Sequence, residues 1–135
     1  NTGAVTLLAD GLHTVLDAHQ VPCEVRERDE IVLGVQEALT NIALHGYRGA
    51  AGQPVHLRLL GSDEAITVRI CDEAPAWKPK HIAAPAFDGS KSSGFGLYLL
   101  ENCFDKVEFL TDGWGHNVLV LEKHWRTKHI ADYRI

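Results

Sequence analysis

The stretch that decides the fold is EALTNIALHG, residues Glu37–Gly46. It is rich in alanine, leucine and isoleucine, yet Glu37, Asn41 and His45 recur at a spacing of four. Residues four apart lie on one face of a helix, so these polar side chains are expected to form one continuous stripe. The stripe runs beside an apolar face made by Val32, Val35, Leu39 and Ile42. A carboxylate and a carboxamide at the edge of the core can line a pocket; the alternative is a polar helix edge that faces solvent.

The composition limits the classes of protein to which the chain can belong. Its 135 residues fit one domain, 1–135, with a real core. Hydrophobic content of 45% and charged content of 23% are ordinary for a globular protein. A net charge of -5 argues against a partner that is a nucleic acid, because nucleic-acid binders usually have a basic face. No apolar run approaches the roughly 20 residues that span a bilayer, so we expect no membrane segment.

The cysteines and the N-terminus indicate the compartment. Cys23, Cys71 and Cys103 are odd in number, far apart and outside any CxxC spacing. This pattern predicts free thiols in a reducing cytoplasm rather than a disulfide framework or a zinc site. The first residue is not methionine and no secretory signal is recognisable, so we expect a trimmed chain or a domain of a longer protein.

The patterning along the chain predicts helices and strands that are segregated from one another. We expect helices over residues 4–19, 29–47 and 94–103, and strands over residues 54–60, 65–71, 107–110 and 117–121. A long irregular segment covers residues 72–93, and a polar tail covers residues 124–135. This order predicts an α+β two-layer sandwich, in which helices cover one face of an antiparallel or mixed sheet.

Two further motifs carry candidate chemistry. ICDEAPAW, residues 70–77, places Asp72 at the end of an apolar strand, where its carboxylate can accept a hydrogen bond from an amino group of a ligand. The alternative is that Asp72 only starts a turn. SSGFGLYLL, residues 92–100, leads from small residues into an apolar helix, whose unpaired N–H groups and dipole attract phosphate oxygens. A lone Gly-x-Gly before a helix is commonplace, so this motif is weak by itself.

The three motifs together, in this order, resemble the Bergerat-fold (GHKL) ATPase superfamily over roughly residues 5–123. EALTNIALHGY, DEAP and the compact size resemble the anti-sigma-factor serine/threonine kinases most closely. The resemblance implies a Bergerat ATP-binding fold, a two-layer α/β sandwich with a mixed, mostly antiparallel sheet covered on one face by about three helices. It also implies a lid over the nucleotide, at about residues 73–93.

The resemblance implies roles for matching residues. Glu37 would be the general base for the target serine hydroxyl, and Asn41 would hold the Mg²⁺ that bridges the triphosphate of ATP. Asp72 would bind the adenine amino group, and His45 would support the pocket wall. The full set of implied nucleotide-binding positions is Asn41, His45, Asp72, Ala74, Ala76, Lys91, Ser93, Gly94, Phe95, Gly96, Leu97 and Asn117.

The adenine end of the site departs from the family pattern. The family's two glycines after the adenine-binding aspartate are Ala74 and Ala76 here. Each adds a methyl group where the backbone passes close to the nucleotide, and alanine resists positive φ, so the change either weakens ATP binding or shifts the base. The Gly-Thr that usually precedes the last strand is Gly115-His116, and Asn117 is a candidate substitute for the threonine hydroxyl.

The phosphate end and the N-terminus depart from the pattern as well. An arginine that the kinases tend to have just before Gly-x-Gly corresponds to Ser92 or Ser93, with Lys91 nearby. A lysine can serve as a point charge but lacks the bidentate geometry of arginine. The family begins with a strand before its first helix, and residues 1–4 are too few to form it.

These observations lead to one functional hypothesis and two alternatives. The resemblance implies an ATP-dependent protein serine/threonine kinase that phosphorylates a STAS-domain anti-anti-sigma protein, with a sigma factor as a second partner and a homodimer as a further option. A nucleotide-responsive partner-binding module without turnover is the first alternative, because the adenine motif has changed. A detached ATPase domain of a larger sensor protein is the second.

Overall fold

The computed structural model of the chain describes residues 11–75 and 96–125. Its four strands are β1 (Val55–Gly61), β2 (Ala65–Asp72), β3 (Lys106–Thr111) and β4 (Asn117–His124). They form one sheet in the order β1-β2-β4-β3, and every neighbouring pair is antiparallel. Every strand pair in the described sheet is therefore antiparallel. This agrees with the expectation that most of the sheet is antiparallel.

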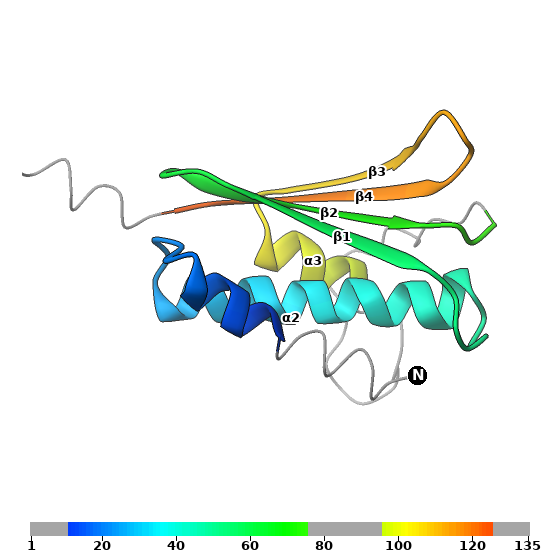
Figure 1. The fold of residues 1–135 in the computed structure, drawn as a ribbon, viewed down its shortest axis with the longest axis horizontal. Helices are drawn as coiled ribbons and strands as arrows, with labels where there is room; N and C mark the ends of the chain where they lie inside the picture. The colour runs from blue at the N-terminus through cyan, green and yellow to red at the C-terminus, as the bar shows by residue number, and fades with distance from the viewer. Residues whose placement is uncertain (1–10, 76–95, 126–135) are drawn as a thin grey trace, which may run out of the picture.

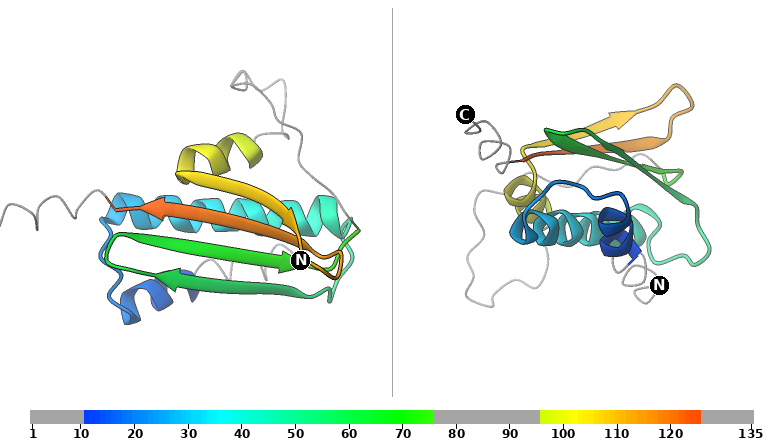
Figure 2. Two further views of the ribbon diagram at one scale, coloured as in Figure 1. Left: turned by 90° about the horizontal axis from the view of Figure 1, so that it is seen from above. Right: turned by 60° about the vertical axis from the view of Figure 1, so that its left-hand side comes forward.

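Helices cover one face of this sheet. Residues 11–18 are helical, and they are followed by α2 (Val25–Asn41), the π-helix η1 (Ile42–Gly46) and α3 (Gly96–Cys103). Figures 1 and 2 show all of these helices below the sheet, with α2 along its full length and α3 beside α2. The predicted α+β two-layer sandwich is confirmed.

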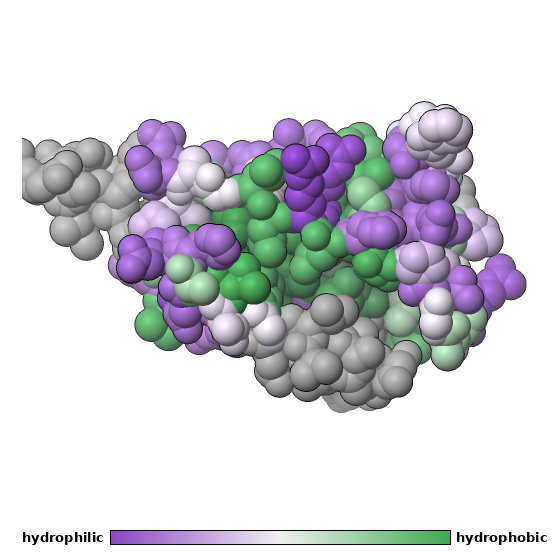
Figure 3. Space-filling model, viewed as in Figure 1, coloured by the Kyte–Doolittle hydropathy of each residue, from purple (hydrophilic) through white to green (hydrophobic). Residues whose placement is uncertain are grey.

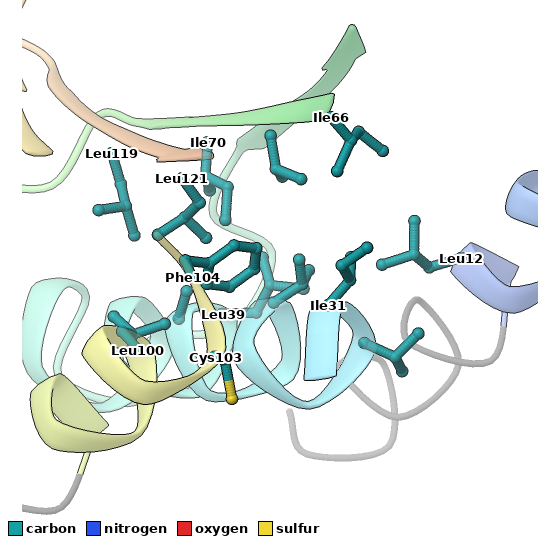
Figure 4. Close-up of a cluster of buried hydrophobic side chains, with 14 of the residues drawn as sticks. Leu12, Ile31, Leu39, Ile66, Ile70, Leu100, Cys103, Phe104, Leu119 and Leu121 are labelled. Atoms are coloured by element: carbon teal, nitrogen blue, oxygen red, sulfur yellow. The ribbon is translucent and has the colours of Figure 1, made fainter. Parts of the chain in front are cut away.

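The strands alternate because one face of the sheet packs on the helices. In β2, Ile66, Val68 and Ile70 point to the helices and are almost fully buried. The apolar residues expected on the α2 face are buried as well, and the Phe104 ring lies between α2 and the sheet (Figure 4). The core cluster is completed by Leu12, Leu16, Ile31, Val32, Val35, Ala38, Leu39, Ile42, Leu100, Cys103, Leu119, Leu121 and Trp125.

The start of α2 differs from the prediction. The helix begins at Val25 rather than near Asp29, because Glu24 and Glu27 form a capping box. The Glu24 N–H donates to Glu27 Oε1 at 2.9 Å, and the Glu24 side chain accepts from the backbone of Glu27. A capping box usually begins with serine or threonine, so a glutamate at the N-cap is not a recognisable start signal in sequence.

The strand β4 and its continuation extend further than expected. β4 runs to His124, and Trp125 is buried between the sheet and the β1–β2 turn. The Trp125 N–H donates to the Glu64 carbonyl oxygen at 2.8 Å, and its indole Nε1 donates to the Ser62 carbonyl oxygen at 3.3 Å. The sequence pattern predicts a polar tail over residues 124–135. Its first two residues, His124 and Trp125, belong instead to the folded part of the chain.

A partly buried ion pair, together with a hydrogen bond to a backbone carbonyl, links α2 and α3 to the sheet. Lys123 of β4 points towards the helices, and its Nζ lies 3.1 Å from Glu30 Oε2 of α2. The same Nζ donates to the Cys103 carbonyl oxygen at the end of α3, at 2.8 Å. Removing the Glu30 charge would leave the buried Lys123 ammonium without its counter-charge, which is a costly change at a buried site.

Gly34 allows α2 and α3 to approach closely, and this gives a testable prediction. A Cβ built at Gly34 collides with the Phe104 ring, which is only 4% exposed and has little room to move. Gly34→Ala should gain about 1 kcal/mol of helix propensity. Overpacking should cost about 1–3 kcal/mol, so we expect a net loss of stability in urea unfolding. Gly11→Ala, where nothing lies within 4 Å of the added Cβ, is the control. A stabilised Gly34→Ala variant would contradict this packing.

Candidate functional site

The centre of the site is the Asp72 carboxylate, at the end of β2. Asp72 is 3% exposed and continues the buried, helix-facing row of Val68 and Ile70. Its Oδ1 accepts the Ala74 N–H at 3.0 Å and the Asn117 Nδ2 at 2.8 Å. Because both donors use Oδ1, the carboxylate has a fixed orientation and Oδ2 is the oxygen that an incoming amino group would use.

Asn117 stands beside Asp72 because the two residues are partners in the β2–β4 register. Its Nδ2 also donates to the Ala74 carbonyl oxygen at 3.0 Å. His116 is directed elsewhere: its ring nitrogens lie 3.6 Å from Glu73 Oε1 and 3.5 Å from Asp112 Oδ2. Of the two residues at the start of the last strand, it is therefore Asn117 that provides the polar group next to Asp72.

Ala74 adopts an ordinary backbone conformation. Within residues 11–75 and 96–125, the non-glycine residues with positive φ are Gln20 and Arg48. Ala74 is not one of them, so its backbone carries no strain from a positive φ, and it is buried against Asp72 and Asn117. Ala76 lies outside the described residues.

A small hollow opens beside the carboxylate. It measures about 20 Å³ and is lined by Ile42, Asp72, Phe109, Leu110, Asn117, Val118 and Leu119. A space of this size holds about one water molecule. An adenine ring therefore requires these side chains to move, or lies partly outside the hollow.

Glu37 and Asn41 lie on the last turns of α2 and are half-buried, as expected for residues at the edge of the core. The helix then changes register: the Tyr47 N–H donates to the Ile42 carbonyl oxygen at 2.8 Å, an i to i+5 bond of a π-helix. His45 lies within this π-helix and is exposed. That His45 shares a stripe with Glu37 and Asn41 stays a prediction.

The glycine motif leads into α3, as predicted. α3 begins at Gly96, and Leu97 is buried in its first turn. Figures 1 and 2 show α3 antiparallel to α2, so its N-terminus is directed towards the end of α2 that carries Asn41. The predicted phosphate-side residues Lys91, Ser93, Gly94 and Phe95 lie outside the described residues.

The β3–β4 turn is held rigid next to the site. Asp112 Oδ1 accepts the N–H groups of Trp114 at 2.8 Å and His116 at 2.9 Å. The hydrogen bond from the His116 N–H is the main cause that lowers the pKa of the Asp112 carboxyl, followed by the bond from Trp114. The turn thereby fixes where β4 begins, and so where Asn117 lies.

Tyr47 also belongs to the surroundings of Asp72, although the sequence patterns assigned it no role. Its hydroxyl oxygen accepts the Glu73 N–H at 2.7 Å, one residue after Asp72. Its position in EALTNIALHGY, two residues after His45, was the available signal.

Other features of the described residues lie away from this site. A cavity of about 640 Å³ lies between residues 15–22 and β1, at the opposite end of the β1–β2 hairpin from Asp72. Figure 3 shows hydrophobic surface between the sheet and the helices on this side of the molecule. All three cysteines are free thiols, as predicted.

Two further kinds of feature are absent from residues 11–75 and 96–125. No three His, Cys, Asp or Glu side chains gather as a metal site there. No helix in the same part of the chain combines the length and hydropathy needed to cross a membrane.

Comparison with known proteins agrees with this geometry. The family model described as histidine kinase-like ATPase domain matches residues 2–123. A serine/threonine-protein kinase named BtrW, from Bordetella bronchiseptica, is 28% identical over 104 residues, which cover 73% of this chain and 72% of the relative. An anti-sigma F factor from Bacillus thuringiensis is 29% identical over 100 residues, covering 69% of this chain and 66% of the relative, and one from Bacillus cereus matches equally. With its buried strand-end aspartate and its helices over one face of an antiparallel sheet, the chain belongs to the histidine kinase-like (GHKL) ATPase domain family, near the anti-sigma-factor kinases.

Proposed function

We propose that this chain is an ATP-dependent protein serine/threonine kinase of the anti-sigma-factor type. It would phosphorylate a STAS-domain anti-anti-sigma protein and thereby regulate transcription through a sigma factor. The observation that carries the proposal is the buried Asp72 carboxylate, oriented through Oδ1 by Ala74 and Asn117, in a chain of the ATPase domain family. The names of the relatives, a serine/threonine-protein kinase and anti-sigma F factors, support the choice of reaction.

In this proposal, each end of the site has its own task. Asp72 accepts a hydrogen bond from the adenine amino group through Oδ2, while Asn117 keeps the carboxylate in place. Asn41, on the last turn of α2, coordinates Mg²⁺ through its amide oxygen, which is a ligand of the type that hard cations prefer. The N–H groups at the start of α3, from Gly96 onwards, receive phosphate oxygens, and Gly94 is the other glycine of the proposed phosphate motif.

The chemistry requires little of the protein beyond positioning and one proton acceptor. The serine oxygen takes the γ-phosphoryl group of bound ATP and ADP leaves, while Mg²⁺ would neutralise part of the phosphate charge. Glu37 lies one helical turn before Asn41 and accepts the proton of the target serine hydroxyl as its oxygen attacks. Glu37 is half-buried at the edge of the core, so its carboxylate keeps access to solvent.

The remaining elements of the proposal concern organisation. Residues 1–135 form a single domain, residues from about 73 to 93 cover the nucleotide, and residues after Trp125 form a polar tail. The protein acts in the cytoplasm, where reduced thiols such as Cys23, Cys71 and Cys103 persist. A homodimer is the expected assembly, and no nucleic acid or membrane partner is involved.

Nucleotide binding is tested by thermal unfolding with and without Mg²⁺-ATP. At about 100 times its dissociation constant, ATP should stabilise the fold by about 2.7 kcal/mol, which raises the Tm of a domain this size by several degrees. Mg²⁺ alone and ATP with a chelator are the controls. An unchanged Tm at millimolar Mg²⁺-ATP would contradict the nucleotide site.

Kinase activity is then tested by transfer of label from ATP to STAS-domain proteins that the chain binds. Absence of label on a bound partner would overturn the proposed kinase activity.

The changed adenine motif, with Ala74 and Ala76 in place of the family's glycines and His116 in place of its threonine, supports a second candidate function. This is a partner-binding module that responds to nucleotide without turnover. In that case Glu37→Ala would leave both nucleotide affinity and partner binding unchanged, and no labelled product would form with either protein.

A further inference from the structure

Three segments of the chain meet at the hydroxyl group of Tyr47. Tyr47 directly follows the π-helix η1 and packs against the core. Its hydroxyl donates to the Pro54 carbonyl oxygen at 2.6 Å and accepts the Glu73 N–H at 2.7 Å. Pro54 directly precedes β1, and Glu73 directly follows β2. One oxygen atom therefore joins the end of the helix to both strands of the hairpin.

The direction of these hydrogen bonds is fixed by their partners. A carbonyl oxygen can only accept a hydrogen bond, so the phenol proton must point to the Pro54 carbonyl oxygen. A backbone N–H can only donate, so the phenol oxygen must accept the hydrogen bond from the Glu73 N–H. Donation to Pro54 needs the neutral phenol. Burial raises the pKa of Tyr47, which keeps the hydroxyl protonated at neutral pH.

The Tyr47 hydroxyl acts next to the carboxylate of the proposed nucleotide site. The Glu73 N–H belongs to the peptide bond that links Glu73 to Asp72, so its hydrogen bond sets the plane of that peptide. Val55, the residue after Pro54, is the register partner of Asp72 in the β1–β2 ladder. Tyr47 thus restrains the backbone of Asp72 from the side opposite to Asn117, its partner in β4.

The π-helix connects the same tyrosine to the hollow. The Tyr47 N–H donates to the Ile42 carbonyl oxygen at 2.8 Å, and Ile42 lines the hollow beside Asp72. An α-helical continuation would have paired the Tyr47 N–H with Ala43 instead. The backbone of Tyr47 is therefore hydrogen-bonded to Ile42, which lines the hollow. The hydroxyl of Tyr47 is hydrogen-bonded to the N–H of Glu73, the residue directly after Asp72.

We propose that Tyr47 is a positioning residue for base recognition: its hydroxyl holds the Asp72 backbone so that Oδ2 faces the amino group of an adenine nucleotide. This inference rests on the proposed function, since it assigns a role at the same site. Tyr47 does not touch the base. It acts on the geometry of the carboxylate that does, and it therefore controls the discrimination between bases more than the affinity for the triphosphate.

The test compares Tyr47→Phe with the wild-type chain. The substitution removes one oxygen atom and keeps the aromatic ring that packs on the core. Calorimetric titration measures the Kd for ATP and for inosine triphosphate, which carries an oxo group in place of the adenine amino group, each with Mg²⁺. Loss of the hydroxyl should weaken ATP binding about five- to tenfold, the equivalent of about one hydrogen bond, and change the Kd for inosine triphosphate less than about twofold. The preference for ATP should fall accordingly.

Ser62→Ala is the matched control. Ser62 Oγ accepts hydrogen bonds from the N–H groups of Glu64 at 3.2 Å and Ala65 at 3.1 Å. Like the Tyr47 hydroxyl, it therefore holds backbone groups in place, but at the far end of the same hairpin. It should lower the Tm in the same manner as Tyr47→Phe and leave the ratio of the two Kd values unchanged.

The outcomes separate the inference from the function on which it rests. A reduced preference for ATP in Tyr47→Phe, with the Ser62→Ala ratio unchanged, supports the positioning role. An unchanged ratio in Tyr47→Phe, or an equal loss for both nucleotides, overturns it while the nucleotide site stands. A wild-type chain that binds neither nucleotide overturns the proposed function, and the role of Tyr47 with it.

Discussion

Asp72→Asn is expected to weaken ATP binding about 10- to 100-fold and to improve binding of inosine triphosphate relative to ATP. The Ala74 N–H and Asn117 Nδ2 both donate to Oδ1, so the amide oxygen of the new side chain must take that position. The amide nitrogen then replaces Oδ2 and presents N–H groups to the base. Two donors face each other when the base is adenine, whereas the oxo group of hypoxanthine accepts.

Calorimetric titration with each nucleotide and Mg²⁺ measures this reversal. Asp105→Asn is the control: Asp105 Oδ2 accepts the His124 N–H at 2.7 Å, so it too is an aspartate that bonds backbone, but at the far end of the sheet. Its ratio of Kd values should equal that of the wild-type chain. If Asp72→Asn kept the wild-type preference for ATP, the carboxylate would not contact the base.

Glu37→Gln is expected to slow phosphoryl transfer about 10²- to 10⁴-fold while the Kd for Mg²⁺-ATP changes little. Glutamine keeps the size of the side chain and its hydrogen-bonding capacity at the edge of the core, but it cannot accept a proton from a serine hydroxyl at neutral pH. A loss in the rate constant without a loss in nucleotide affinity is therefore the signature of a general base. Single-turnover transfer to a bound partner protein measures it.

The same substitution at another position of α2 provides the control for Glu37→Gln. Glu30 is paired with the buried Lys123, so Glu30→Gln should lower the Tm because Lys123 loses its counter-charge. Its rate of phosphoryl transfer, measured well below the Tm, should match that of the wild-type chain. A Glu37→Gln protein with the wild-type rate would remove Glu37 from the reaction.

Much of the fold follows from local pattern. The alternation of Ile66, Val68 and Ile70 identified a strand with one buried face, and the structure confirms β2 with that face on the helices. Likewise, the helical spacing of Val35 and Leu39 identified the buried side of α2. Such periodicity is legible in sequence because burial on one face of a regular element imposes it.

The ends of the elements were less predictable. A glutamate capping box set the start of α2, and the hydrogen bonding changes to that of a π-helix after Asn41. Each is a choice between hydrogen-bonding patterns of similar energy. A glutamate is not the usual first residue of a capping box, and the ends of elements are the part of the fold least legible in sequence.

The residues of the candidate site can also be separated into those predictable from sequence and those that only the tertiary structure brings together. By itself, the sequence determined that Glu37 and Asn41 share a helix, that Asp72 ends a strand and that a glycine motif opens α3, because residue type and local spacing carry that information. Only the tertiary structure decided that Asn117 pins the Asp72 carboxylate and that Tyr47 bonds the peptide after it. Those contacts join residues 45 and 26 positions apart. They depend on strand register and on the rotation of the last helical turn, which arise when the sheet and helices pack together.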